Sequence, residues 1–387
     1  MEYQIQHMTP VLFGTDTAKQ TGDRLKMFGC KKVLCVYDQG IKKAGIADKV
    51  INSIKAAGIG VAVYEGVQAD PPDFTIDEGA AIGRKEQVDG VVGIGGGSSM
   101  DTAKAVNVML TNPGSISDLM QFRPGGPPAM PKPGKTLILL PTTSGTGSEV
   151  TAVAVLTDSK AHDKKGIGGP VTRATLAIID PLLTVGMPPS VTADTGMDVF
   201  AHAIGAITAN RANQMSDIMG EASIKILWKF LPIAVKDGKN IEARSQMSFA
   251  AMAAGYAFQD SMTQLEHAIG HTLGSLYHIP HGNACGVCLG EMTEFDADVM
   301  PNGIRLIAGA MGMETTGGPV AIGTKLKYAI RKFADSIGQK KLSQMNIPES
   351  DLEKIAEIAG GPGLSMFSPK PVNKEIVLKM LKEAYYR

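Results

Sequence analysis

The sequence predicts an N-terminal α/β domain built on a parallel sheet, followed by an all-α C-terminal domain. In the first half, short runs rich in β-branched residues alternate with stretches of helical period, which is the pattern of βαβ units. After residue 190 the strand signals fade and long helical patterns continue. The chain has 387 residues, more than the ~250–300 that one core usually holds, so two domains are expected.

Four runs bounded by Gly, Pro or Asp predict strands, over residues 31–38, 60–67, 88–97 and 135–143. Helical periodicity over 45–58 and 76–87 places helices between the first three, so the sheet should be parallel with helices on both faces. One more apolar run follows at 174–179. The glycine-rich segment 164–170 predicts a loop.

The second half is dominated by four helical patterns, over residues 191–209, 216–231, 243–258 and 370–386. A proline-rich break at 187–190 precedes the first of them. We place the domain boundary within 181–190, which gives an α/β domain over 1–185 and a helical domain over 186–387.

Composition excludes several classes of protein. The 38 basic and 38 acidic side chains balance, and no basic stripe is visible, so we expect no nucleic-acid partner. The N-terminus lacks the pattern of a secretory signal, and the longest weakly polar stretch, 247–258, is shorter than the ~20 residues of a membrane helix. We therefore expect a cytoplasmic protein without membrane contact.

The four cysteines are too few to stabilise a chain of this length through disulfide bonds, and a reducing compartment would keep them as thiols. Cys285 and Cys288 form one C-x-x-C pair. A single pair is weak support for zinc or redox chemistry, so we interpret both as buried small apolar residues on one helix face.

Two loops of small residues follow predicted strands. GGGSSMDTAK (95–104) opens a helix, where glycines let the backbone approach a ligand and free N–H groups attract a pyrophosphate. A plain tight turn is the alternative. PTTSGTGSEVT (141–151) follows the next strand at the same sheet edge and strengthens the nucleotide interpretation. Asp38 ends the first of these strands, where it could accept hydrogen bonds from a ribose or simply cap a turn.

Four of the seven histidines fall within fifteen residues, in HAIGHTLGSLYHIPHG. His267 and His271 share one helix face, and His281 follows a predicted helix end at 279–280, so a loop can fold it back. Upstream, Asp198 and His202 repeat the four-residue spacing inside an apolar helical stretch. One such pair could be a satisfied core hydrogen bond, but two pairs together with His281 favour a metal site.

One carboxylate and three imidazoles are borderline ligands that suit Fe(II) or Zn(II) better than Mg or Ca. Asp194 lies four residues before Asp198, so helix geometry alone leaves the choice of carboxylate open.

The sequence resembles the iron-containing (group III) alcohol dehydrogenases. The likeness rests on GGGSSMDTAK, PTTSGTGSEVT, TGMDVFAHAI, the segment from HAIGH to IPHG and the closing SPKPVNKEIVLKML, and it covers nearly the whole chain. It implies the architecture that this family shares with dehydroquinate synthase: an N-terminal dinucleotide-binding domain, a helical metal-binding domain and an active-site cleft between them. It also implies NAD(H), one divalent metal and at least a dimer.

The family's site residues carry over by position. The implied metal ligands are Asp198, His202, His267 and His281, and the non-ligand histidine near the nicotinamide is His271. The implied cofactor positions are Asp38, Gly96, Gly97, Ser98, Asp101, Thr142, Thr143, Thr146, Thr151 and Lys164. Candidate walls of the substrate pocket are Thr151, Val153 and Phe258.

Three departures from the family pattern lie close to the ligands. Gly205 stands where Glu is usual, Ile207 stands where an aromatic residue is frequent, and NACGVC (283–288) replaces a V-A-N-A-like run. We expect none of them to touch an implied ligand. They indicate that the substrate pocket differs from those of well-known members.

The predicted activity is the NAD-dependent, metal-assisted interconversion of a small aldehyde and its primary alcohol, with Asp38 favouring NAD over NADP and His271 moving a proton. Packing or hydrogen bonding to the cofactor is the alternative for His271. A metal- and NAD-dependent lyase related to dehydroquinate synthase is the rival activity. Its phosphorylated substrate would demand Lys and Arg near the metal, and 192–209 and 261–281 contain none. A non-enzymatic nucleotide sensor would leave the histidines unexplained.

Overall fold

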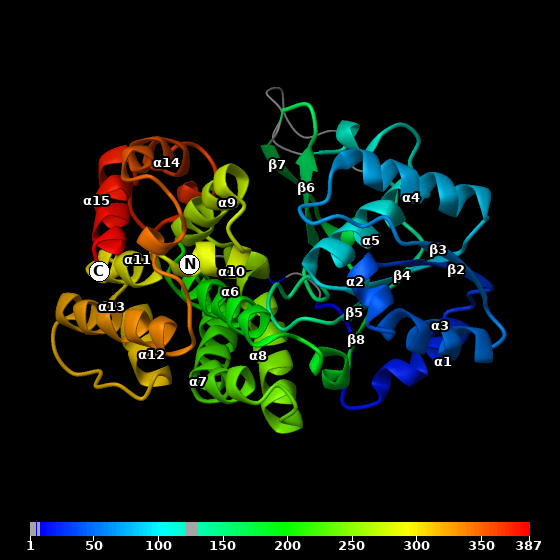
Figure 1. The fold of residues 1–387 in the computed structure, drawn as a ribbon, viewed down its shortest axis with the longest axis horizontal. Coiled ribbons are helices and arrows are strands. Elements are labelled where there is room, and N and C mark those ends of the chain that lie inside the picture. The colour runs from blue at the N-terminus through cyan, green and yellow to red at the C-terminus, as the bar shows by residue number, and fades with distance from the viewer. Residues whose placement is uncertain (1–4, 6–7, 121–130, 162) are drawn as a thin grey trace. The chain divides into compact units, whose positions relative to one another are not determined.

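A computed structural model describes residues 5, 8–120, 131–161 and 163–387 of the chain. It divides into two compact units that are interleaved along the sequence. The sheet unit extends to Thr143 and resumes over Ser148–Gly186, whereas the helical unit contains Ser144–Gly147 and Met187–Arg387. The predicted fold class, a parallel sheet followed by helices, is confirmed (Figure 1).

Within the described residues, the large sheet has six parallel strands in the order β1-β8-β5-β4-β2-β3. Their bounds are β1 (Val11–Phe13), β2 (Lys32–Val36), β3 (Gly60–Tyr64), β4 (Gly90–Gly95), β5 (Thr136–Pro141) and β8 (Leu176–Ile179). The chain adds β3 on one side of β2 and then β4 on the other. The strand order therefore reverses between β2 and β4, and ligands of such sheets bind beyond the carboxyl ends at this switch point.

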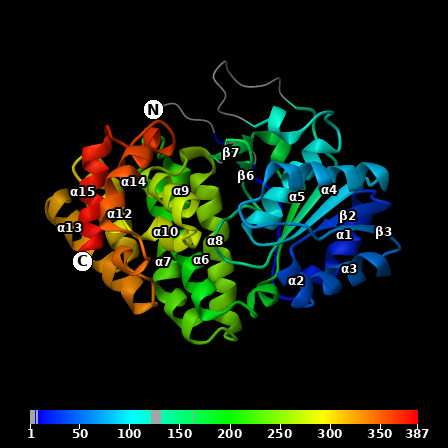
Figure 2. The same ribbon diagram turned by 45° about the horizontal axis from the view of Figure 1, so that its top comes forward.

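Helices cover both faces of the sheet because successive side chains of a buried strand point to opposite faces. Leu34 and Val36 of β2 belong to the core shared with α4 and α5, whereas Val33 and Cys35 belong to the core shared with α1 and α3. Figure 2 shows α4 and α5 along their face of the sheet. The helices are α1 (Thr21–Met27), α2 (Gln39–Lys43), α3 (Ile46–Ala56), α4 (Asp73–Lys85) and α5 (Gly97–Met109).

The prediction of a loop over residues 164–170 is wrong. Residues Asp163–Gly168 form strand β7, which pairs antiparallel with β6 (Val153–Asp158) in a separate two-stranded sheet. Glycines in this segment obscure its strand character, and the strand forms because β6 supplies a complete ladder of partners. An ion pair between Lys165 and Asp158 (2.5 Å) joins the two strands at one end.

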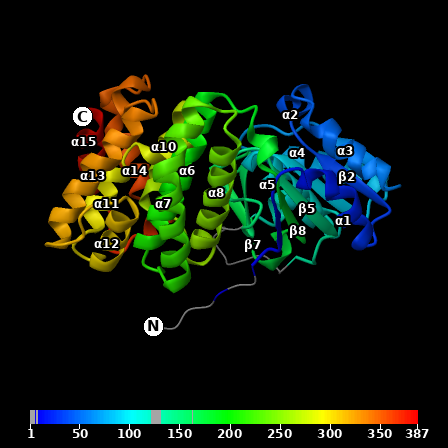
Figure 3. The same cartoon turned by 90° about the horizontal axis from the view of Figure 1, so that it is seen from below.

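The helical unit is formed by α-helices and short 3₁₀ turns, as predicted for the second half. Its helices are α6 (Pro189–Thr208), α7 (Gln214–Lys236), α8 (Ile241–Ser261), α9 (Leu265–Tyr277), α10 (His281–Gly286), α11 (Leu289–Asp296), α12 (Pro301–Ala310), α13 (Pro319–Ser336), α14 (Leu352–Ala359) and α15 (Lys374–Tyr385). Figure 3 shows α6, α7 and α8 side by side. Phe200 of α6 packs at the centre of this core against Trp228 and Phe333. None of the described helices combines the length and the apolar character that crossing a membrane requires.

Candidate metal centre and cofactor loops

Helix α6 contributes Asp198 and His202 to the interior of the helical unit. The helix starts on prolines and is buried along most of its length, so both polar side chains lie within an apolar core. Asp198 is 2% exposed and His202 is 5% exposed. The His202 ring stacks on Phe258 at a centroid distance of 4.3 Å, which holds it toward Asp198.

Helices α9 and α10 contribute His267 and His281. Helix α9 ends at Tyr277, with the left-handed His278 as its C-cap, and α10 begins at His281 after Pro280. Gly282 allows α10 to lie directly on α6, because a methyl group at this position would overlap the Asp194 carbonyl oxygen. The close approach of the two helices carries the His281 ring to the Asp198 carboxylate.

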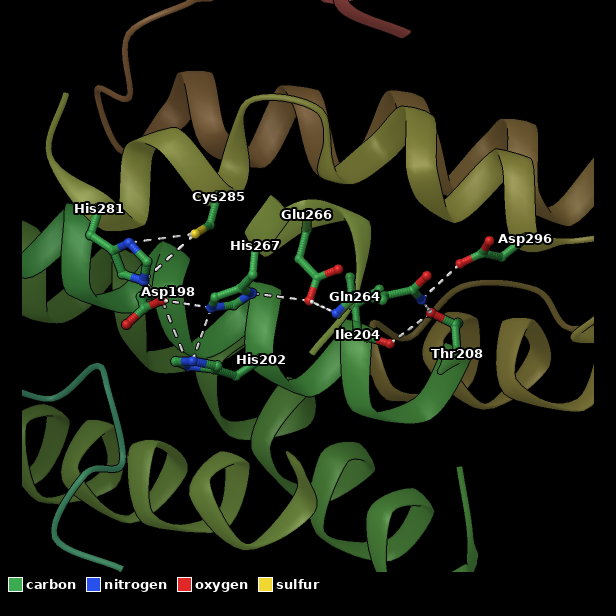
Figure 4. Close-up of polar contacts among 10 residues, drawn as sticks. All are labelled: Asp198, His202, Ile204, Thr208, Gln264, Glu266, His267, His281, Cys285 and Asp296. Atoms are coloured by element: carbon green, nitrogen blue, oxygen red, sulfur yellow. Dashed lines mark hydrogen bonds and ion pairs between the residues drawn. The ribbon is translucent and has the colours of Figure 1, made fainter. Parts of the chain in front are cut away.

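The three histidines of the predicted ligand set surround one carboxylate oxygen of the fourth, Asp198 (Figure 4). Asp198 Oδ1 lies 3.7 Å from His202 Nδ1, 3.6 Å from His267 Nε2 and 3.5 Å from His281 Nε2. His202 Nε2 and His267 Nε2 face each other at 3.1 Å. Asp198 Oδ1 and His202 Nδ1 are buried and have no hydrogen-bond partner among the described residues.

The charge states of Asp198 and His202 suit metal ligation. Burial alone would raise the pKa of Asp198, but the nearby histidines outweigh it and hold this pKa well below its ordinary value. Burial lowers the pKa of His202 to about 3, against the opposing effect of Asp198. The carboxylate is therefore ionised and His202 is neutral at neutral pH, which are the forms that bind metal.

Cys285 lies beside these ligands, so the expectation that the NACGVC segment touches no ligand is wrong. The sequence interpretation had treated Cys285 only as a buried apolar residue. Its sulfur is 3.7 Å from His281 Nε2 and belongs to a group of potential donors with Asp198, His267 and His281. Burial raises the pKa of Cys285, but His267 and His281 outweigh it and lower this pKa. Cys288 is likewise buried, and burial together with the charge of Glu291 raises its pKa well above the usual range. The prediction that the two cysteines share one helix face is wrong, because Cys285 lies in α10 and Cys288 is the N-cap of α11.

Glu266 is a second residue near the ligands that the sequence interpretation missed. Its side chain is fully buried, and its Oε1 lies 3.0 Å from His267 Nδ1. The signal available in the sequence was its position immediately before an implied ligand, together with the missing side chain at Gly205.

The remaining candidates of this region lie around the cluster. The His271 ring is partly exposed, with its centroid 5.5 Å from that of His281 and 6.0 Å from that of His267. Asp194, the alternative carboxylate, instead accepts a hydrogen bond from Gln339 Nε2 at 3.0 Å. Asp198 is therefore the carboxylate that faces the histidines.

In the sheet unit, the two predicted loops meet at the carboxyl ends of β4 and β5. Gly96 is the N-cap of α5 and no side chain caps this helix, so its first N–H groups can receive an anion. The Thr142 N–H donates to the Gly95 carbonyl oxygen at 3.0 Å, which joins the loops. Gly97 and Ser98 begin α5, and a Cβ on Gly96 would touch Thr143. Thr146 belongs to the helical unit.

Asp38 lies at the switch point and also caps a helix. One carboxylate oxygen accepts from the Ile41 N–H at 3.0 Å, at the start of α2, and the other accepts from Ser99 Oγ at 3.1 Å. Asp38 therefore caps α2, as the alternative interpretation of the sequence expected, and its bond with Ser99 holds the carboxylate against the first turn of α5. A carboxylate at this point suits a ribose hydroxyl.

Asp101 and Thr151 join a buried network in the sheet unit. The Asp101 oxygens accept from Ser148 Oγ at 2.6 Å and from the Val155 N–H at 2.9 Å. The buried Lys104 ammonium donates to Ser148 Oγ at 2.8 Å and to Thr151 Oγ1 at 3.4 Å. This network ties α5 to the loop before β6. Lys164 lies on β7, and its ammonium is 2.7 Å from Asp70.

Family comparisons cover most of the chain. The model of the iron-containing alcohol dehydrogenase family matches residues 9–181, and the model of the C-terminal part of the Fe-containing alcohol dehydrogenase family matches residues 192–385. A choline dehydrogenase of Bacillus subtilis is 40% identical over 308 residues, which cover 80% of this chain and 76% of that protein. An NAD-dependent methanol dehydrogenase of Bacillus methanolicus is 32% identical over 375 residues, 96% of this chain and 97% of that protein.

Solved structures agree with this assignment. The crystal structure of a 1,3-propanediol oxidoreductase matches with a TM-score of 0.94 and 31% identity, covering 99% of this chain and 100% of that one. A sulfoacetaldehyde reductase from Bifidobacterium kashiwanohense, solved in complex with NAD⁺, matches with a TM-score of 0.90 and 31% identity, covering 100% and 99%. These oxidoreductases favour the dehydrogenase over the lyase. The chain belongs to the iron-containing alcohol dehydrogenase family and is an NAD(H)-dependent oxidoreductase.

Proposed function

We propose that this enzyme interconverts a small aldehyde and its primary alcohol at a divalent metal held by Asp198, His202, His267 and His281. The observation that carries the proposal is the buried Asp198 Oδ1, which lies within 3.5–3.7 Å of three imidazoles and accepts no hydrogen bond. A buried carboxylate without such a partner is unfavourable unless a cation is near it. The residues therefore fit a metal.

The donor set of one carboxylate and three imidazoles suits Fe(II), the ion that gives the family its name, and also Zn(II). When bound, such a metal supplies Lewis-acid polarisation of a carbonyl or alcohol oxygen. We assign His271 the task of moving the alcohol proton, because its ring lies beside His281 and is partly exposed to solvent. Proton exchange with solvent would then accompany each hydride transfer.

For the cofactor, we propose that the uncapped start of α5 receives the pyrophosphate and that Asp38 receives the adenine ribose. The support is the position of Asp38, 3.1 Å from Ser99 at the switch point of the sheet. The proposed cofactor set is Asp38, Gly96, Gly97, Ser98, Asp101, Thr142, Thr143, Thr146, Thr151 and Lys164. Asp101 and Thr151 would act by shaping the loops, because both are engaged within the chain.

The substrate is proposed to be small. Several relatives act, by their names, on choline, methanol, 1,3-propanediol and sulfoacetaldehyde, which share a short carbon chain and differ in charge. Another relative, from Geobacillus thermodenitrificans, is named a long-chain-alcohol dehydrogenase. A panel of short aldehydes that includes hydroxylated, cationic and anionic members therefore spans the expected specificity.

The test is reconstitution with Fe(II) under anaerobic conditions, followed by assay of NADH oxidation with this panel. Consumption of one NADH for each alcohol formed, with transfer of deuterium from labelled NADH to the product, supports the proposal. Elimination from the substrate without net NADH consumption would instead support the lyase. His281→Ala should lose metal by elemental analysis, whereas His278→Asn, a change at the exposed C-cap of α9, should retain it.

We further propose a cytoplasmic enzyme that forms a dimer or a larger oligomer. All four cysteines are free thiols, as a reducing compartment would maintain them. Sedimentation equilibrium of the metal-loaded enzyme tests the assembly, and a monomer at micromolar concentration would contradict it.

A further inference from the structure

Glu266 presents a buried carboxylate to a metal-ligand candidate from the neighbouring position in the sequence. It lies in the first turn of α9, it is fully buried, and its Oε1 is 3.0 Å from His267 Nδ1 (Figure 4). The same oxygen accepts from the Gln264 N–H at 3.1 Å. The helix dipole favours a carboxylate at the N-terminus of a helix, where Glu266 lies.

The contact to Nδ1 determines which nitrogen of His267 can bind a metal. A carboxylate oxygen only accepts hydrogen bonds, so Nδ1 carries the proton and donates it. The lone pair of the neutral ring is then on Nε2, the nitrogen that lies 3.6 Å from Asp198 Oδ1. A carboxylate behind a histidine in this way orients the ring and increases its basicity as a ligand.

Helix α6 makes room for Glu266. A methyl group on Gly205 would overlap Glu266 Oε1, so the carboxylate occupies the space that any side chain at position 205 would need. The missing side chain on α6 therefore accommodates the acidic side chain on α9.

We infer that Glu266 is a positioning residue that fixes the orientation and tautomer of His267 for metal binding. The inference rests on the proposed metal site. It goes beyond that site because it assigns a role to a residue outside the ligand set and accounts for the glycine at position 205.

A purely structural role is the alternative, and the structure offers a matched control for it. Gln264, whose N–H is bound by Glu266, also donates from Nε2 to Thr208 Oγ1 at 2.6 Å and to Asp296 Oδ2 at 3.0 Å. Asp296 is buried in the same network but is not paired with a histidine. Loss of Glu266 or of Asp296 would disturb the hydrogen bonds of Gln264. Only loss of Glu266 should also disturb the orientation of the metal-ligand candidate His267.

The experiment measures Co(II) and Zn(II) affinity of the full chain by competition with a chelator, together with the visible spectrum of the Co(II) form. Glu266→Ala is expected to weaken metal binding by about 10–100-fold and to change the Co(II) spectrum. Glu266→Gln keeps an acceptor and the side-chain volume, so its loss should be smaller. Asp296→Asn should leave affinity and spectrum at wild-type values, whatever its effect on the melting temperature of the metal-free protein.

The outcomes separate this inference from the proposed function. If wild type binds metal and both Glu266 variants bind it equally tightly, with an unchanged Co(II) spectrum, Glu266 is structural and the inference is overturned. If Glu266→Ala does not fold, Glu266→Gln decides by the same two measurements. Absence of metal binding by the wild-type chain would overturn the proposed metal site itself.

Discussion

The Asp38 carboxylate and the Ser99 hydroxyl lie 3.1 Å apart across the switch point of the sheet. Asp38 follows β2 and Ser99 lies in the first turn of α5 after β4, so the pair joins the two elements where a dinucleotide would bind. The carboxylate is thereby held near the position expected for the adenine ribose, where it would repel the 2′-phosphate of NADP.

Removal of this charge should therefore improve the use of NADPH. A like-charge contact of this kind costs on the order of 1–3 kcal/mol, or roughly 5–150-fold in relative kcat/KM. Asp38→Asn is the preferred variant because its amide oxygen can still cap α2. The measurement is the ratio of kcat/KM for NADH and NADPH. Equal use of both cofactors by the wild-type enzyme would remove Asp38 from the explanation.

His271→Ala should lower kcat without loss of metal. Proton transfer by a positioned side chain usually contributes 10²–10⁴-fold, so we expect a decrease of about that order and a flatter pH profile. Elemental analysis checks that the metal remains, and His278→Asn is the control on the same stretch of chain. A raised KM for NADH with unchanged kcat would make His271 a cofactor-binding residue, and loss of metal would make it a ligand.

Cys285→Ser should change metal preference more than it changes stability. The sulfur lies among the donors of the cluster, and thiolates favour Zn(II) over harder ions such as Mn(II). We therefore expect the Zn(II) affinity of the variant to fall by a larger factor than its Mn(II) affinity, measured by chelator competition. An equal change for both ions would show that Cys285 of α10 only packs against α9.

The fold could be predicted from the sequence wherever a local pattern of residues determines the secondary structure. The strands β2, β3, β4, β5 and β8 are apolar runs with clear ends, and the long helices of the second half are periodic. The strand β1 has only three residues and pairs with Ala177–Ile179, far along the chain, so no local sequence pattern predicts it. The same holds for β7, whose strand form depends on β6.

The site was predictable to the extent that helix spacing and family resemblance name its residues. The four-residue spacing of Asp198 and His202 indicates one helix face, but it cannot choose between Asp194 and Asp198. That choice depends on how α10 lies on α6 at Gly282. The positions of Glu266 and Cys285 beside the candidate ligands could not be predicted, because they depend on side-chain direction and on glycines that let helices approach closely.

Asp296 should make the stability of the helical unit depend on pH. Burial, reinforced by the charge of Glu266, raises the pKa of Asp296 to about 8, although hydrogen bonds from Gln264 and Thr208 and the charge of Lys370 oppose the shift. An unfolded Asp has a pKa of ~3.9. Between about pH 4 and pH 8 the unfolded chain loses this proton while the folded chain keeps it, so the contribution of Asp296 to the free energy of unfolding falls as pH rises.

Asp296→Asn should remove this dependence, because the amide resembles the protonated acid and can still accept from Gln264. The melting temperature of the metal-free variant, relative to wild type, should therefore rise steadily from about pH 5 to about pH 8. The control is Asp298→Asn, two residues along the chain. Asp298 is exposed and its pKa is lowered by the hydrogen bond from Lys370, so it is ionised in both states throughout this range and its variant should differ from wild type by a constant amount. A constant difference for Asp296→Asn as well would mean that Asp296 is already ionised in the folded protein, and the burial argument would fail at this residue.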